Sequence, residues 1–141
     1  MVTEDFNISY YSNNGTSNLN VRPSLDYFFT DRLSIGGRLG LSWYSSNGNS
    51  NQSRSIAWRF GANFGLGEKV SIWLTLENGI VLPENSSNLL FTNLVFPVLL
   101  HPAPHFFVGI GPYLDGQRTL GESESDVDFG GGLTSFVGGW W

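Results

Sequence analysis

The fold of this chain is decided by an alternating stretch, RLSIGGRLGLSWY, which runs from Arg32 to Tyr44. Its odd positions are apolar apart from one glycine: Leu33, Ile35, Gly37, Leu39, Leu41 and Trp43. Its even positions are mostly small or charged: Arg32, Ser34, Gly36, Arg38, Gly40, Ser42 and Tyr44. Successive side chains of a β-strand point to opposite faces, so the stretch predicts a strand with one apolar face. Whether that face meets a protein core or lipid decides the class of protein.

The composition is unusual for a soluble domain. The 141 residues suffice for one domain, which we take as 1–141, and cysteine is absent. Charged residues make up 13% of the chain, against about 25% in ordinary soluble domains. The net charge of -5 argues against a nucleic-acid partner, because no basic surface is available to replace the counterions around phosphates. No apolar run reaches the length of about 20 residues that a transmembrane helix requires.

The alternation recurs along the whole chain, and no sustained helical period accompanies it. Eight runs show it: 5–12, 18–29, 32–44, 55–66, 70–80, 88–100, 106–114 and 127–141. Strands of about ten residues cross a bilayer at a tilt. Pro97 cannot donate a backbone hydrogen bond, so we expect a bulge or irregular pairing in the sixth run. The apolar face of that run is assigned to Leu90, Leu94, Phe96, Val98 and Leu100.

The connections between the runs alternate in length. Tight turns are expected at 30–32, 67–69 and 101–105, and longer polar loops at 13–18, 45–53, 83–87 and 115–126. Outer-membrane barrels show this asymmetry, with short periplasmic turns at one end and longer external loops at the other. With eight strands, both termini lie at the end of the short turns.

The apolar faces are expected to point outward. The interior of an eight-stranded barrel is just wide enough for side chains to fill it, and it would have to accept Trp43, Trp58 and Phe60 besides many aliphatic residues if the apolar face were inside. The outside would then carry Gly and Ser rather than the charges of a soluble surface. Outward apolar faces suit lipid, and a closed sheet pairs every backbone group. We therefore predict an all-β fold, an eight-stranded antiparallel up-and-down transmembrane β-barrel.

The alternating strands, the loop asymmetry and the terminal FVGGWW resemble the small bacterial outer-membrane β-barrel family of OmpA-type and OmpW-type barrels. The segments LSIGGRLGLS and PVLLHPAPHFFVGIGP are similar to outer-membrane barrels of this size. The resemblance implies a Gram-negative outer-membrane location, contact with lipid or detergent, and insertion by the outer-membrane assembly machinery. It also implies that Trp141, an aromatic last residue where Phe is commoner, is the assembly signal. Because VTEDFN after Met1 lacks the features of a signal peptide, we expect a mature form.

Charged residues fall on the inward-facing positions of several strands: Arg22, Asp26, Arg38, Arg59 and Glu77. Charges inside a narrow barrel must pair, because an unpaired buried charge is costly, so we interpret these residues as a structural network. The functional alternative is a constriction that gates or selects ions. We expect Gly36 and Gly40 to make room for Arg38. Inward aromatic residues are expected to fill much of the lumen: Tyr44, Trp73, Phe91, Phe107 and Tyr113.

No catalytic, cofactor-binding or metal-binding pattern is found, and we expect no enzymatic activity and no cofactor. His101 and His105, in HPAPH, have the spacing of helical metal ligands, but the prolines between them favour a rigid turn. The acidic segment GESESD at 121–126 lacks the spacing of a calcium loop. We expect a monomer with a structural or anchoring role and a filled interior. The alternatives are a narrow pore for ions or small solutes and, third, a soluble lipocalin-like binding barrel.

Overall fold

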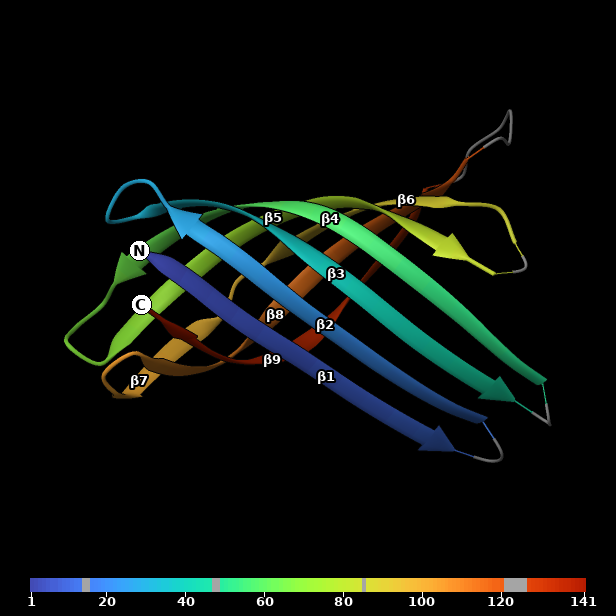
Figure 1. The fold of residues 1–141 in the computed structure, drawn as a ribbon, viewed down its shortest axis with the longest axis horizontal. Coiled ribbons are helices and arrows are strands. Elements are labelled where there is room, and N and C mark those ends of the chain that lie inside the picture. The colour runs from blue at the N-terminus through green and yellow to red at the C-terminus, as the bar shows by residue number, and fades with distance from the viewer. Residues whose placement is uncertain (14–15, 47–48, 85, 121–126) are drawn as a thin grey trace.

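A computed structural model describes residues 1–13, 16–46, 49–84, 86–120 and 127–141. The strands are β1 (Val2–Asn13), β2 (Thr16–Phe28), β3 (Leu33–Ser46), β4 (Asn49–Gly65), β5 (Val70–Pro83), β6 (Leu89–Val95), β7 (Val98–Ala103), β8 (Phe106–Thr119) and β9 (Asp128–Trp140). Every pairing is antiparallel, and β1 pairs with β9, so the sheet closes into a barrel (Figure 1). No helix among the described residues is long and apolar enough to cross a membrane.

The barrel wall has eight strand positions, because β6 and β7 follow one another in the same position. Both strands pair with β5 on one side and with β8 on the other. Phe96 and Pro97 interrupt the ladder between them, which is the irregular pairing expected from the proline. The break keeps some backbone bonds, because Trp73 N donates to Pro97 O (3.0 Å) and Phe96 N donates to Pro112 O (3.0 Å). The predicted all-β fold, a barrel of eight antiparallel strands, is therefore confirmed, with β6 and β7 counted as one interrupted strand.

The strands are longer than the expected ten residues. Apart from β6 and β7 they contain 12 to 17 residues. The difference arises at polar segments that were expected to be loops, since pairing continues to Asn13↔Thr16 and to Ser46↔Asn49. Ser, Thr and Asn here extend the hairpins, because backbone pairing is available to them as long as the two strands stay in register.

The two ends of the barrel differ, and we name them by the chain termini. The terminal end holds both termini and the turns at 29–32, 66–69 and 104–105, and the distal end is the opposite one, where β1, β3, β5 and β8 finish (Figure 1). At the terminal end, the two ends of the chain are joined in the barrel wall by backbone hydrogen bonds between Val2 and Trp141 in both directions (3.1 Å each).

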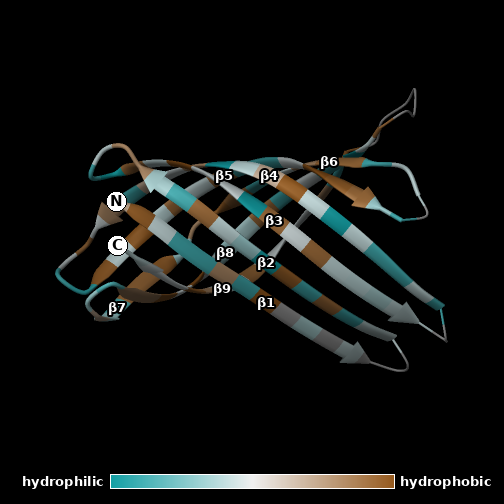
Figure 2. Cartoon of the chain, viewed as in Figure 1, coloured by the Kyte–Doolittle hydropathy of each residue, from teal (hydrophilic) through white to brown (hydrophobic). Residues whose placement is uncertain are grey.

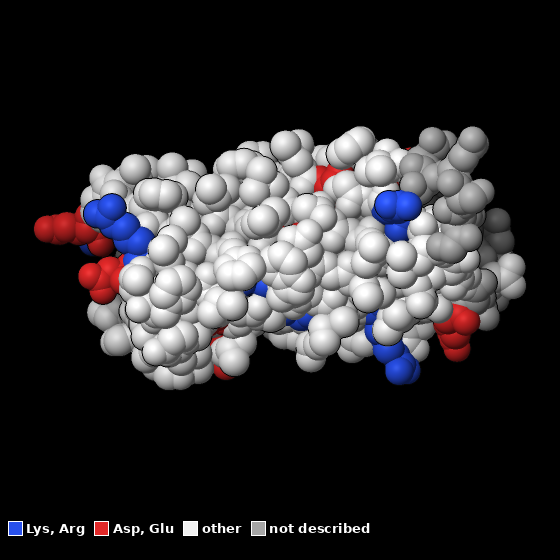
Figure 3. All heavy atoms as spheres, turned by 90° about the horizontal axis from the view of Figure 1, so that it is seen from above, with Lys and Arg blue, Asp and Glu red and all other residues white. Residues whose placement is uncertain are grey.

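The apolar faces point outward, as predicted. Along β3, Leu33, Ile35, Leu39, Leu41 and Trp43 are exposed, whereas Ser34, Arg38 and Gly40 are buried. The strands of the barrel show this alternation of apolar and polar residues along their length (Figure 2). Charged side chains on the visible surface gather mainly at the two ends of the long axis (Figure 3). Large apolar side chains such as Leu39, Ile56 and Leu76 are exposed along the middle of the barrel, and we call this surface the apolar outer belt.

The glycines of β3 make room for residues other than Arg38, which corrects our expectation. A Cβ at Gly36 would lie 2.2 Å from Leu25 O and 2.4 Å from Asp26 Oδ1. A Cβ at Gly40 would lie 2.1 Å from Ser55 Oγ and 3.7 Å from Arg22 Cγ. Glycine is therefore needed at these two inward positions, because atoms of the neighbouring strands occupy the space that a Cβ would fill.

Adjacent glycines on opposite faces give a matched test of this packing. We expect Gly36→Ala to lower the free energy of unfolding by roughly 1–3 kcal/mol, because a backbone oxygen and a buried carboxylate would have to move. Gly37→Ala is the control, since its outward Cβ would meet only Ala57 O at 3.5 Å. Urea unfolding in micelles, followed by tryptophan fluorescence, measures both variants. Equal midpoints for the two variants would contradict the packing argument.

Candidate functional site

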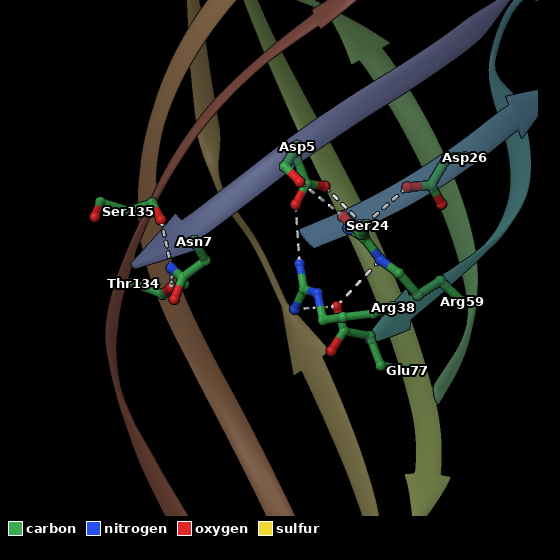
Figure 4. A network of polar contacts seen from close by, with 9 residues as sticks. All are labelled: Asp5, Asn7, Ser24, Asp26, Arg38, Arg59, Glu77, Thr134 and Ser135. Atoms are coloured by element: carbon green, nitrogen blue, oxygen red, sulfur yellow. Dashed lines mark hydrogen bonds and ion pairs between the residues drawn. The ribbon is translucent and has the colours of Figure 1, made fainter. Parts of the chain in front are cut away.

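A buried ionic layer crosses the barrel interior near the terminal end. Its guanidinium groups belong to Arg59 on β4 and Arg38 on β3, and its carboxylates belong to Asp5, Asp26 and Glu77 (Figure 4). Arg59 is 1% exposed and Asp26 0%. The register explains the meeting, because Arg59 lies opposite Glu77 on β5 and opposite Gly36 on β3, which in turn lies opposite Asp26 on β2.

Arg59 is the centre of the layer. Its Nη1 lies 2.7 Å from Asp5 Oδ2 and 2.8 Å from Asp26 Oδ2, and it also donates to Ser24 Oγ. Its Nε lies 3.1 Å from Glu77 Oε1. Three carboxylates from three different strands thus converge on one guanidinium group. Since the group is fully buried, these contacts replace the water that it would otherwise bind.

Arg38 extends the layer toward the distal end. Its Nη2 donates to Asp5 Oδ1 at 3.1 Å, and its Nη1 forms an ion pair with Glu77 Oε1 at 2.6 Å. The N–H groups around Glu77 are not directed at its oxygens, so neither oxygen has a hydrogen-bond partner among the described residues. Glu77 is therefore held by charge attraction rather than by directed hydrogen bonds.

The structure brings together four of the five charged residues that the sequence singled out: Asp26, Arg38, Arg59 and Glu77. The fifth, Arg22, faces the lumen further toward the distal end and forms no ion pair among the described residues. Asp5 was missed, although it binds both arginines. Asp5 lies on the opposite face of its strand from Phe6 and Ile8, and this alternation could have placed it inside from the sequence.

An apolar layer lies against the ionic layer. Phe28, Trp73, Leu99 and Phe107 form a buried cluster, and Phe136 belongs to the same cluster. The guanidinium carbon of Arg59 lies 5.1 Å from the centre of the Trp73 ring, a distance at which a cation is attracted to the ring face. The ionic layer and the aromatic cluster are therefore in direct contact inside the barrel.

Not every aromatic residue expected inside contributes to this filling. Trp73 and Phe107 are 2% and 1% exposed. Phe91 and Tyr113 are half-buried and line a cavity on the distal side. Tyr44 is 43% exposed, because it lies near the distal end of β3 where the strands extend beyond the filled section.

Two cavities lie on either side of the filled section. The distal cavity, of about 400 Å³, is polar and has Arg38 and Glu77 among its lining residues. The terminal cavity, of about 700 Å³, is lined by Trp73, Phe107 and His101 among others. The two cavities share no lining residue, and Asp5, Asp26 and Arg59 line neither of them. Among the described residues, Asp5, Asp26, Arg59, Trp73 and Phe107 are at most 2% exposed, so side chains of the ionic layer and of the aromatic cluster fill the lumen between the two cavities.

The two histidines have separate structural contacts. His101 Nε2 lies 2.9 Å from Ser71 Oγ in the terminal cavity. His105 has a φ of 62° in the turn before β8 and donates from Nδ1 to Trp140 O at 2.9 Å. Among the described residues, no group of three or more His, Asp or Glu side chains is placed to hold a metal ion. The acidic segment 121–126 lies outside those residues.

Comparison with known proteins adds no relative. No protein-family model matches the chain, and neither a curated protein nor a solved structure matches it significantly. The features of the barrel that bear on function are its apolar outside, its filled lumen and its two cavities.

The ionic layer leads to a stability prediction. We expect Arg59→Met to lower the free energy of unfolding by about 3–5 kcal/mol, because it leaves three buried carboxylates without their cation. Arg38→Met should cost less, since its partners Asp5 and Glu77 would both keep their ion pairs with Arg59.

Arg54→Met is the matched control, because Arg54 is an exposed arginine on the same strand as Arg59. Its effect should stay within about 0.5 kcal/mol. Urea unfolding of the three variants in one detergent measures the differences. If Arg59→Met and Arg54→Met unfold at the same urea concentration, the layer does not hold the barrel together.

Proposed function

We propose that the chain is an integral membrane barrel of the Gram-negative outer membrane with a structural or anchoring role. The observation that carries the proposal is the inverted arrangement of the barrel, with an apolar outer belt around a charged interior. A soluble binding barrel requires the opposite arrangement, an apolar interior and a polar surface. In a membrane, lipid covers exposed side chains such as Leu39 (59%) and Ile56 (57%).

The pattern of strands and the last strand support membership of the small OmpA-type and OmpW-type barrels. Within this proposal, Trp141 is the signal that the assembly machinery reads. The residue is 63% exposed at the terminal end, and its backbone is held by Val2. An exposed aromatic residue next to the last strand is accessible to a partner protein.

The closed lumen favours the structural role over the pore. A conducting path would have to pass the ionic layer, in which Asp5, Asp26 and Arg59 are at most 2% exposed. Moving these side chains aside would separate ion pairs in a water-poor interior, which is costly. We therefore propose a barrel with a filled middle and a cavity at each end. We propose no catalytic activity for it.

Membrane placement is tested by a charge in the outer belt. Leu39→Arg should reduce the stability of the barrel in lipid vesicles by roughly 2–4 kcal/mol, because Leu39 lies in the middle of the belt. Leu66→Arg, at the turn between β4 and β5, is the control and should have little effect. Heat-modifiable migration on gels after refolding into vesicles reports the folded fraction. A native chain that stays folded and monomeric without detergent or lipid would contradict the proposal.

The filled lumen is tested by electrical recording. The refolded barrel should give no discrete conductance steps in a planar bilayer, because the ionic layer separates the two cavities. A porin inserted at the same protein concentration serves as the positive control. Reproducible steps from the native chain, absent from a heat-unfolded sample, would favour the narrow pore instead.

A further inference from the structure

The barrel wall is incompletely paired between β1 and β9. Backbone bonding runs from Val2 and Trp141 only as far as Phe6↔Val137, although β1 continues to Asn13 and β9 begins at Asp128. By contrast, β1 and β2 stay paired to Asn13↔Thr16. We call the unpaired part, between residues 8–13 of β1 and 128–134 of β9, the seam.

A side chain marks the point where backbone pairing ends. Asn7 Nδ2 donates to Thr134 Oγ1 at 2.9 Å and to Ser135 O at 2.6 Å. These bonds tie the two strands together at the edge of the seam. Beyond them, no backbone pairing between β1 and β9 is found in the described residues.

The seam lies beside the apolar belt. Ile8 pairs with Val21 on β2, and Val21 pairs with Leu41 on β3. The next outward row, Tyr10, Leu19 and Trp43, marks the distal edge of the belt. An open strand edge at this depth exposes backbone groups that lipid cannot satisfy, and such edges are tolerated only where they line a polar or water-filled space.

The distal cavity provides that space and opens through the seam. Among its lining residues are Ile8 and Leu133, one on each side of the seam. Both point outward from the barrel and are 57% and 74% exposed. A cavity bounded by inner polar residues and by these two outer residues connects the lumen with the surface of the barrel.

Two charged side chains that do not belong to the ionic layer line the distal cavity, the cationic Arg22 and the anionic Asp115. Arg22 has no ion pair or hydrogen bond among the described residues. Asp115 on β8 accepts one long hydrogen bond, from Gln117 at 3.4 Å. Arg38 and Glu77 also line the cavity, but they are paired with each other. The charges left to a ligand are thus opposite and equal in number.

We propose that the distal cavity binds the head group of a zwitterionic amphiphile, with the anionic group at Arg22, the cationic group at Asp115 and the apolar chain leaving through the seam. Polar side chains such as Asn7 and Asn93 line the space for the head group. Ile8 and Leu133 provide apolar contacts where the chain emerges. The inference rests on the membrane placement proposed above and adds a binding site to it.

The test uses the refolded chain in dodecyl maltoside micelles, whose sugar head groups carry no charge. The probe is a lysophosphatidylethanolamine with a photoreactive diazirine in its chain. Binding should be saturable, and Arg22→Gln and Asp115→Asn should each weaken it about tenfold or more, because each removes a charge-assisted contact. Arg54→Gln, the same change on the outer face, should leave it unchanged. Dodecanoate, which lacks the cationic group, should bind the native chain more weakly.

The position of the photo-crosslinks separates a seated ligand from general contact with the belt. Crosslinks should concentrate at Ile8 and Leu133 rather than at Ile56 on β4. Equal crosslinking of the three positions, or labelling that is not saturable and is the same in all variants, would overturn the inference. So would light scattering that shows the native chain to be a dimer in these micelles, with a second copy of the chain in the seam.

Two controls keep the outcomes distinguishable. Heat-modifiable migration confirms that each variant is folded before its binding is compared. A native chain that inserts into vesicles but fails to bind the probe overturns the binding site alone. A chain that does not insert overturns the membrane placement and the binding site together.

Discussion

The burial of the Arg59 guanidinium among three carboxylates is the constraint on which the rest of the structure depends. A narrow barrel offers little water to a charge in its interior, so each buried ion needs a partner from a neighbouring strand. Asp5, Asp26 and Glu77 supply these partners from β1, β2 and β5. Side-chain ion pairs across the lumen thus join these strands to β4 in addition to the backbone ladders. The same side chains fill the lumen at that level.

The filled section also determines the difference between the two ends. On its terminal side, the aromatic cluster of Trp73 and Phe107 leaves a cavity near both chain ends. On its distal side, the strands extend further, the interior is polar, and the wall between β1 and β9 is unpaired. A barrel whose middle is filled with side chains still has a polar cavity on its distal side that reaches the unpaired wall, so the proposed binding does not require a conducting lumen.

Much of the fold followed from parity. The alternation along β3 predicted the outward Leu39 and the inward Arg38, and Pro97 predicted the break between β6 and β7. Strand ends were harder to predict, because Ser, Thr and Asn suit both a loop and the last pairs of a hairpin. The charged site was predicted in part: Asp26, Arg38, Arg59 and Glu77 meet, whereas Arg22 remains apart.

The sequence by itself determined which side of each strand is apolar, and hence that the barrel carries its charges inside. That follows from local geometry, because neighbouring side chains alternate whatever the strand pairs with. Only the tertiary structure decided which inward residues meet, since contacts across a lumen depend on the tilt and stagger of all the strands. The same closure brought Asp5 to Arg59, left Arg22 beside the distal cavity and ended the pairing of β1 with β9 at Phe6.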